Sequence, residues 1–99
     1  MPAMTVMDAA LKYLNRRACS QARLRELLLT SGYIEIQINE ALQRLKDWGY
    51  LNDREFGLAR LQALQAKLKS RAFVEADLIQ QQLPKALIDD LLGEYYPEE

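Results

Sequence analysis

Residues 20–33 read SQARLRELLLTSGY, and residues 70–83, fifty positions further along the chain, read SRAFVEADLIQQQL. Each stretch begins with a serine that can cap a helix, and the apolar residues that follow have the spacing of one helix face. The same offset aligns residues 6–14 with 56–64 and residues 38–42 with 88–92. A gap-free offset that preserves both cap and core positions indicates an internal repeat.

The amino-acid composition favours helices over strands. Leucine supplies 18 residues and alanine 12, whereas valine, isoleucine and threonine together supply only 9. Because leucine and alanine are strong helix formers, we predict an all-α fold without a sheet. Its six helices are expected to form two tandem three-helix modules, residues 5–49 and 50–96. Residues 34–38 alternate like a strand, but their apolar spacing continues as a helix to Trp48, which we expect in the core.

Residues that start or end helices divide the chain into these six segments. Thr5, Ser20 and Ser70 can each accept a hydrogen bond from a free amide at a helix N-terminus. Gly32 can adopt the left-handed conformation in which many helices end. The fourth helix is expected to be long and to carry an apolar row as far as Leu68.

Most catalytic and metal-binding arrangements are excluded by residue counts. The chain has no histidine and a single cysteine, Cys19, so one chain holds no Ser-His-Asp triad, Cys-His pair, disulfide or cysteine-rich zinc site. Carboxylates remain, but their spacing offers no metal site, and we expect no enzyme activity, no cofactor and no metal. No apolar run reaches the ~18 residues of a membrane span, so we expect a cytoplasmic protein without membrane contact.

Residues 42–56 read LQRLKDWGYLNDREF and carry a resemblance to a known family. The stretch resembles the joint between modules in the RecX family of recombination regulators, whose pattern is Gly-Tyr-Leu-(Asp/Asn)-Asp-x-x-Phe. We expect Tyr50, Leu51 and Phe56 to pack between the modules, and Asn52 or Asp53 to cap the next helix. The residues that match the pattern position by position are Gly49, Tyr50, Leu51, Asn52, Asp53 and Phe56.

The resemblance implies a regulatory protein, not an enzyme, that binds the RecA recombinase filament and limits its activity in recombination, DNA repair and the SOS response. It also implies that basic module surfaces face the filament and its single- or double-stranded DNA. This sequence departs from the family in having two modules instead of three. Gln82 stands where the family commonly has glycine, and the turn at residues 67–72, KLKSRA, lacks the family's glycines. We expect a monomer.

The net charge of −1 conceals an asymmetry along the chain. Residues 1–74 hold 12 basic and 7 acidic side chains, whereas residues 75–99 hold 1 basic and 7 acidic side chains. Basic residues four positions apart share one helix face and can reach phosphates together, although such residues can also simply solvate a small domain. The residues predicted to face the partner or DNA are Lys12, Arg16, Arg17, Arg23, Arg60, Lys67, Lys69 and Arg71.

Two other functions remain open at the level of the sequence. Residues 41–51 also resemble the recognition helix of a winged-helix transcription regulator, which requires a β-hairpin next. Residues 54–69 have a helical pattern instead. An acidic isoelectric point of about 5.5 is also compatible with a protein-interaction adaptor that does not contact nucleic acid.

Overall fold

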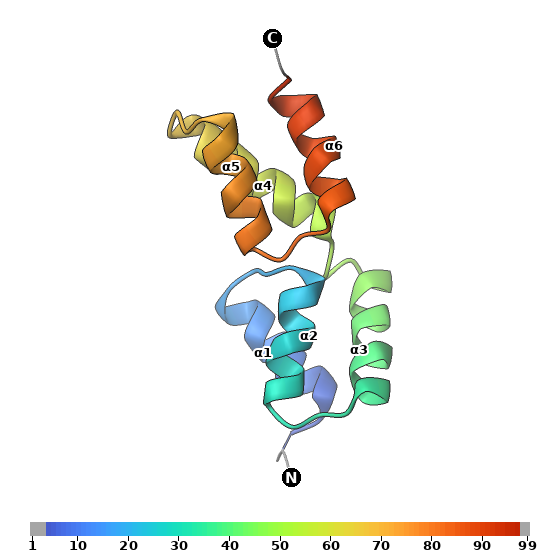
Figure 1. Cartoon of the computed structure of the whole chain (residues 1–99). Coiled ribbons are helices and arrows are strands. Elements are labelled where there is room, and N and C mark those ends of the chain that lie inside the picture. Colours follow the sequence, from blue (N-terminus) through green and yellow to red (C-terminus); the bar gives the residue numbers. More distant parts are fainter. Residues whose placement is uncertain (1–3, 98–99) are drawn as a thin grey trace. The chain divides into compact units, whose positions relative to one another are not determined.

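A computed structural model describes residues 4–97, and in this part of the chain it contains six α-helices and no strand (Figure 1). The all-α prediction is therefore confirmed. Glu98 and Glu99, which belong to the acidic C-terminal segment, lie outside the described residues. The helices are α1 (Val6–Arg16), α2 (Gln21–Thr30), α3 (Glu35–Asp47), α4 (Asp53–Ala66), α5 (Arg71–Gln80) and α6 (Lys85–Tyr95).

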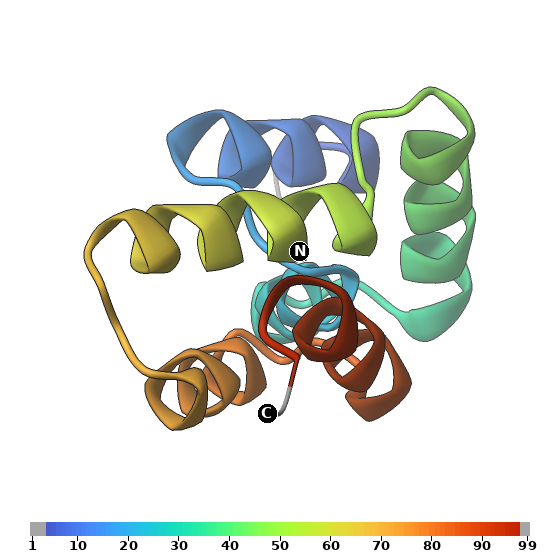
Figure 2. The same cartoon turned by 90° about the horizontal axis from the view of Figure 1, so that it is seen from above.

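The helices form two compact units, Met1–Asn52 and Asp53–Glu99. In the first unit α1, α2 and α3 each contact the other two, and in the second unit α4, α5 and α6 do the same. Figure 2 shows α4 along its length, with α5 and α6 on the same side of it. The units divide between Asn52 and Asp53, whereas the sequence predicts a boundary after Gly49. Leu51 accounts for the difference, because it is buried in the core of the first unit.

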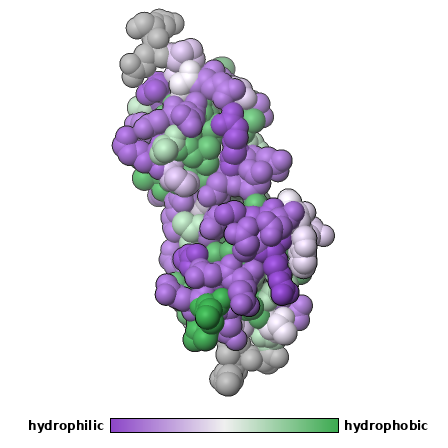
Figure 3. Space-filling model, turned by 90° about the vertical axis from the view of Figure 1, so that its right-hand side faces the viewer, coloured by the Kyte–Doolittle hydropathy of each residue, from purple (hydrophilic) through white to green (hydrophobic). Residues whose placement is uncertain are grey.

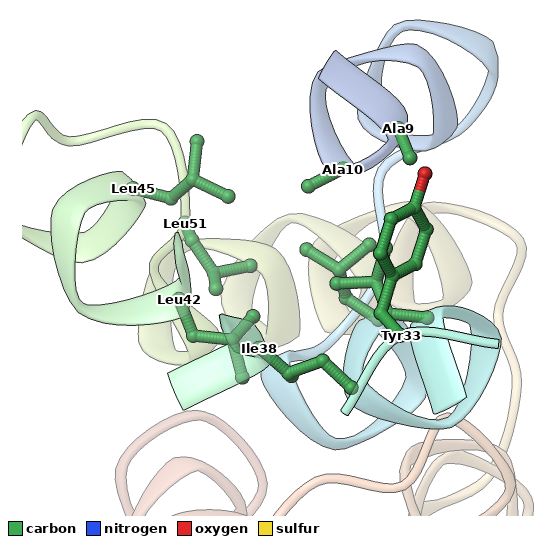
Figure 4. Close-up of a cluster of buried hydrophobic side chains, with 9 residues drawn as sticks. Ala9, Ala10, Tyr33, Ile38, Leu42, Leu45 and Leu51 are labelled. Carbon is green, nitrogen blue, oxygen red and sulfur yellow. The ribbon is translucent and has the colours of Figure 1, made fainter. Parts of the chain in front are cut away.

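The core of the first unit combines small residues on α1 with large aliphatic residues on α2 and α3. Ala9 and Ala10 let α1 approach closely, and Tyr33 points its ring from the α2–α3 turn toward them (Figure 4). The Tyr33 hydroxyl donates a hydrogen bond of 2.7 Å to the backbone carbonyl of Met4, so the buried phenol is satisfied. The other buried members of this core are Leu24, Leu28, Ile38, Leu42, Leu45 and Leu51.

The core of the second unit repeats this arrangement fifty residues later. Val74, Leu78, Ile88 and Leu92 occupy the positions of Leu24, Leu28, Ile38 and Leu42, and all eight side chains are buried. Gly57 lies in this core, where a Cβ atom would be 2.9 Å from Cδ1 of Leu91, so the glycine permits close packing of α4 on α6. The repeat seen in the sequence therefore reflects equivalent packing in each unit.

Side-chain caps fix three helix starts as the sequence predicts. The Thr5 hydroxyl accepts a hydrogen bond of 3.1 Å from the backbone amide of Asp8. Ser20 and Ser70 accept equivalent bonds, also of 3.1 Å, from the amides three residues later. Each cap satisfies an amide that has no partner inside its helix, which is worth roughly 1 kcal/mol.

Four helices end in the same hydrogen-bonded turn, in which one residue takes a positive φ. At the end of α3, the Tyr50 amide donates to the Leu45 carbonyl at 2.9 Å and the Gly49 amide to the Lys46 carbonyl at 3.1 Å. Helices α2, α4 and α5 end with equivalent pairs of bonds. The residues with positive φ are Gly32 (100°), Gly49 (80°), Leu68 (60°) and Gln82 (61°).

Two core predictions are wrong, and helix ends explain both. Trp48 is 58% exposed, because α3 ends at Asp47 and the chain leaves the helical row before Trp48 can join it. Leu68 is 91% exposed, because α4 ends at Ala66 and Leu68 forms the left-handed turn that follows. Figure 3 shows one face of the molecule, which is largely hydrophilic but has hydrophobic side chains exposed in each unit.

Candidate partner-binding surfaces

Two residues of the first unit, Lys12 and Arg16, stand one turn apart on α1 and share a surface. Both are exposed, and they line a recess of about 200 Å³ together with Tyr13, Ser31 and Tyr33. The Ser31 hydroxyl donates to the Leu27 carbonyl at 2.8 Å, so Tyr13 is the donor in its 2.6 Å hydrogen bond with Ser31. With these hydroxyl protons engaged, the two cations are the groups best suited to hold an anion at this recess.

Arg17 and Arg23 follow Arg16 in the sequence but do not line this recess. Arg17 caps the C-terminus of α1 and is exposed. Arg23 forms an exposed ion pair of 3.1 Å with Glu26, one turn along α2. An exposed pair of this kind stabilises a protein little, so Arg23 can exchange Glu26 for another anion at small cost.

Lys67 and Lys69 lie in the turn between α4 and α5, and both are exposed. The Lys69 ammonium lies over the ring of Phe73, with 4.8 Å between the nitrogen and the ring centroid. This cation–π contact orients Lys69 without neutralising its charge. Lys67 and Lys69 are therefore the best-placed cations for a partner among the predicted residues of the second unit.

Arg71 has a structural contact in the second unit. Its Nε donates a hydrogen bond of 2.8 Å to the backbone carbonyl of Tyr96, joining the start of α5 to the end of α6. Replacing Arg71 would therefore disturb the fold of the unit as well as its surface charge.

Arg60 is held in an ion pair instead of facing solvent freely. Its Nε and one terminal nitrogen donate to the two carboxylate oxygens of Asp77, at 2.7 and 2.9 Å. The Asp77 side chain is 11% exposed, and its hydrogen bonds from Arg60 hold the pKa of the Asp77 carboxyl below its ordinary value. This bidentate pair joins α4 to α5, so Arg60 is committed to the unit's internal structure.

Comparison with known proteins connects this architecture to a family. A protein named regulatory protein RecX from Syntrophotalea carbinolica is 36% identical to the chain over 95% of the chain and 65% of the relative. The chain belongs to the RecX family. RecX proteins of Caldanaerobacter subterraneus and Listeria monocytogenes are 27% and 28% identical over 91% and 93% of the chain. The chain spans 46% and 35% of those two relatives. No family model matches it, and no solved structure gives a significant match.

The RecX motif at the joint divides between the two units. Leu51 is buried in the first core, and Phe56 packs half-buried against the second. Gly49 supplies the positive φ that ends α3, and Asn52 directly precedes α4, which begins at Asp53. A capping role for Asn52 or Asp53 remains a prediction, as does packing of Leu51 and Phe56 between modules.

Tyr50 does not fit the expectation of burial, because its side chain is 63% exposed. It forms an edge-to-face pair with Trp48, with ring centroids 6.4 Å apart and planes at 84°. The sequence favours packing for both aromatics, with stacking on a base or contact with a partner as the alternative. Gly49, the residue after Trp48, could have identified Trp48 as exposed, because a glycine at this position ends the helix.

The departures from the RecX pattern coincide with unusual backbone. Gln82 has the positive φ that Gly32 has in the first unit, and Leu68 has a positive φ in the turn that lacks the family's glycines. The chain therefore retains these turns with residues that adopt them at some energetic cost.

Several alternative sites are missing from the part of the chain that the structure describes. The wing expected after a winged-helix recognition helix is absent, because residues 54–66 belong to α4. Residues 4–97 contain no group of three acidic or cysteine side chains arranged to hold a metal ion. Among the same residues, no helix is long and apolar enough to span a membrane.

Proposed function

We propose that this RecX-family chain is a regulatory binding protein that modulates the RecA recombinase filament on DNA. The observation that carries the proposal is its match, over 95% of its length, with a relative named regulatory protein RecX. The relatives are named as regulatory proteins and not as enzymes. In this proposal the chain acts as a cytoplasmic monomer without a cofactor, through binding alone.

The basic residues supply the contacts in this proposal. In the first unit, Lys12 and Arg16 flank a recess of about 200 Å³, where a phosphate or carboxylate would meet two cations. In the second unit, Lys67 and Lys69 extend from the exposed turn after α4. Each phosphate contact on single-stranded DNA contributes about −0.7 to the slope of log affinity against log salt concentration. A few such contacts give weak binding that is independent of sequence and strongly dependent on salt.

The direct test measures ATP hydrolysis and strand exchange by RecA on single-stranded DNA, with and without this protein. We expect a dose-dependent change in both rates. Two double variants, Lys12→Ala with Arg16→Ala and Lys67→Ala with Lys69→Ala, should each weaken filament binding and make the salt slope shallower. Arg71 and Arg60 are left unchanged because each has a structural contact within the second unit.

A matched control removes two charges elsewhere. Arg54 and Lys85 form exposed ion pairs with Glu94 and Asp89, at 2.7 and 3.0 Å. Replacing both by alanine changes the net charge as much as either test variant does, and should leave filament binding unchanged. Equal losses of filament binding in all three double variants would mean that binding depends on the net charge and not on the two basic sites. Salt-independent filament binding would favour the protein-interaction adaptor.

A further inference from the structure

Two aromatic side chains at the end of α3 are exposed to an unusual degree. Trp48 and Tyr50 are 58% and 63% exposed, although tryptophan is on average a highly buried residue in folded proteins. They meet edge to face, with centroids 6.4 Å apart. An edge-to-face pair uses the edge of one ring against the face of the other, so ring surface remains free for stacking.

The backbone presents this pair rigidly. The Tyr50 amide donates to the Leu45 carbonyl at 2.9 Å, and the Trp48 amide donates to the Arg44 carbonyl at the same distance. The next residue, Leu51, is 4% exposed and anchors the chain in the first core. Both aromatics are therefore held between a helix end and a buried side chain. Their backbone is already ordered, and each ring has only two side-chain torsions to fix, which lowers the entropic cost of stacking a ligand.

The exposed residues of the last turn of α3 are charged instead of apolar. Arg44 is exposed and lies four residues before Trp48, whose amide donates a hydrogen bond to the Arg44 backbone carbonyl. Lys46 is also exposed in this last turn, and the Asp47 carboxylate accepts a hydrogen bond of 2.9 Å from Gln43. Arg44 also borders a hollow of about 240 Å³ between α1 and α3, lined by Val6, Met7, Gln37, Glu40, Ala41 and Arg44.

We infer that Trp48 and Tyr50 form a stacking platform for the bases of single-stranded nucleic acid, with Arg44 placed to meet the adjoining phosphate. Aromatic surface beside a cation suits an unpaired nucleotide, which offers a π face and an anion together. The bases of a duplex are stacked on one another and do not offer their faces in this way. A protein-binding hot spot would instead place the aromatics inside a wider apolar patch. This inference deepens the proposed function by naming a nucleic-acid contact in the first unit.

The experiment uses Trp48 as its own reporter, because it is the only tryptophan in the chain. The intact protein is titrated with a short oligothymidylate, and separately with an abasic oligonucleotide of the same length that has phosphates but no bases. Stacking on a base quenches indole fluorescence, so we expect quenching and tighter binding with oligothymidylate only. Equal affinity for both oligonucleotides, or oligothymidylate binding without quenching, would overturn the inference.

Variants that keep the charge test the same point independently. Trp48→Leu, followed by the anisotropy of a labelled oligothymidylate, should bind roughly 5- to 150-fold more weakly, the loss expected for one stacked base. Its salt slope should match that of the unmodified protein, because no cation is removed. Tyr50→Ala retains the reporter and should reduce both affinity and quenching. Ile36→Ala is the matched control, since Ile36 is a 67% exposed apolar residue at the other end of the same helix.

These measurements contain no recombinase, so they succeed or fail independently of the proposed regulation of RecA. Oligothymidylate binding that disappears in Trp48→Leu, with RecA activity unaffected by the protein, would support the platform and contradict the proposed function. The reverse result, in which Trp48→Leu binds oligothymidylate normally but no longer alters RecA activity, would overturn the platform. It would assign the aromatic pair to a protein contact. Far-ultraviolet circular dichroism checks that each variant is folded.

Discussion

The two units share a core pattern but differ in how their first two helices are joined. In the second unit Arg60 and Asp77 form a bidentate ion pair between α4 and α5. Fifty residues earlier, the equivalent positions hold Ala10, which is buried, and Leu27, which is half-buried. The same three-helix frame therefore accepts either apolar side chains or a charged pair at this place. The buried aliphatic residues therefore specify the three-helix fold, whereas positions at the edge of the core can hold either apolar or charged side chains.

A second difference concerns the turn between the last two helices of each unit. Gly32 and Gln82 both take positive φ, and both turns carry the same pair of backbone hydrogen bonds. Glycine adopts this conformation readily, whereas a residue with a side chain is strained there by roughly 1 kcal/mol. The hydrogen bonds and the burial of the following residue, Tyr33 or Leu83, thus maintain the turn even without glycine.

The largest expected effect tests whether the two cores are equivalent. Leu28 and Leu78 occupy matching positions and are both fully buried. Replacing either with alanine should destabilise its own unit by about 2 to 5 kcal/mol, because it leaves a cavity in a close-packed core. Urea unfolding gives the total loss, and native-state hydrogen exchange shows which unit has lost protection. Loss of protection in both units from a single substitution would contradict the separation of the two cores.

The next effect tests the exchange of apolar and charged contacts. Asp77→Leu alone should destabilise the second unit by about 1 to 3 kcal/mol, because it leaves the half-buried Arg60 without its carboxylate. Adding Arg60→Ala gives this unit the residue types of Ala10 and Leu27. The double variant should recover most of the lost stability in urea unfolding. If it is no more stable than Asp77→Leu, the two positions are not interchangeable between units.

A smaller effect tests the turns with positive φ. Gln82→Gly should stabilise the second unit by up to about 1 kcal/mol, because glycine relieves the strain at φ 61°. Gly32→Gln should destabilise the first unit by about the same amount. Thermal unfolding of both variants measures the two changes, and Gln81→Gly, one residue earlier and at negative φ, is the control. Stabilisation by the control equal to that by Gln82→Gly would exclude the backbone explanation.

The smallest effect is the pH dependence of the Arg60–Asp77 pair. The pKa of Asp77 is lowered in the folded chain by its hydrogen bonds from Arg60, relative to an ordinary value of 3.8. The pair therefore contributes its full stability above about pH 4 and loses it as the pH falls through the lower, folded pKa. Urea unfolding across this acidic range should show a steeper loss for the unmodified protein than for Arg60→Ala with Asp77→Leu. Parallel curves would show that Asp77 is not a source of acid sensitivity.

Much of the fold could be predicted because its signals are local or periodic. Ser20 and Ser70 predict helix starts because their hydroxyls can cap a helix. The fifty-residue offset pairs Leu28 with Leu78 from the sequence alone. The Arg60–Asp77 pair could not be predicted from spacing on one helix, because its members lie on different helices. The repeat does contain a clue, since two apolar positions of the first unit become two opposite charges in the second.

The candidate site was harder to predict than the fold. Helical spacing placed Trp48 in a core row, but a row ends where its helix ends, and here that point is Asp47. Helical spacing also predicts Leu68 in a core row, although α4 ends before it. No glycine marks that end in the sequence, because Leu68 itself takes the positive φ. Among the basic residues, sequence position could not separate Lys12 and Arg16, which share an open recess, from Arg71, which binds a backbone carbonyl.

The placement of Leu51 has a consequence for how the chain folds during its synthesis. Leu51 completes the first core one residue before the unit boundary, and the two cores have no residue in common. Translation of the second unit takes on the order of 2 to 10 s, whereas small helical units fold in microseconds to milliseconds. The first unit can therefore finish folding before the second core can assemble. A chain with two matching halves is thereby protected from exchanging helices between them.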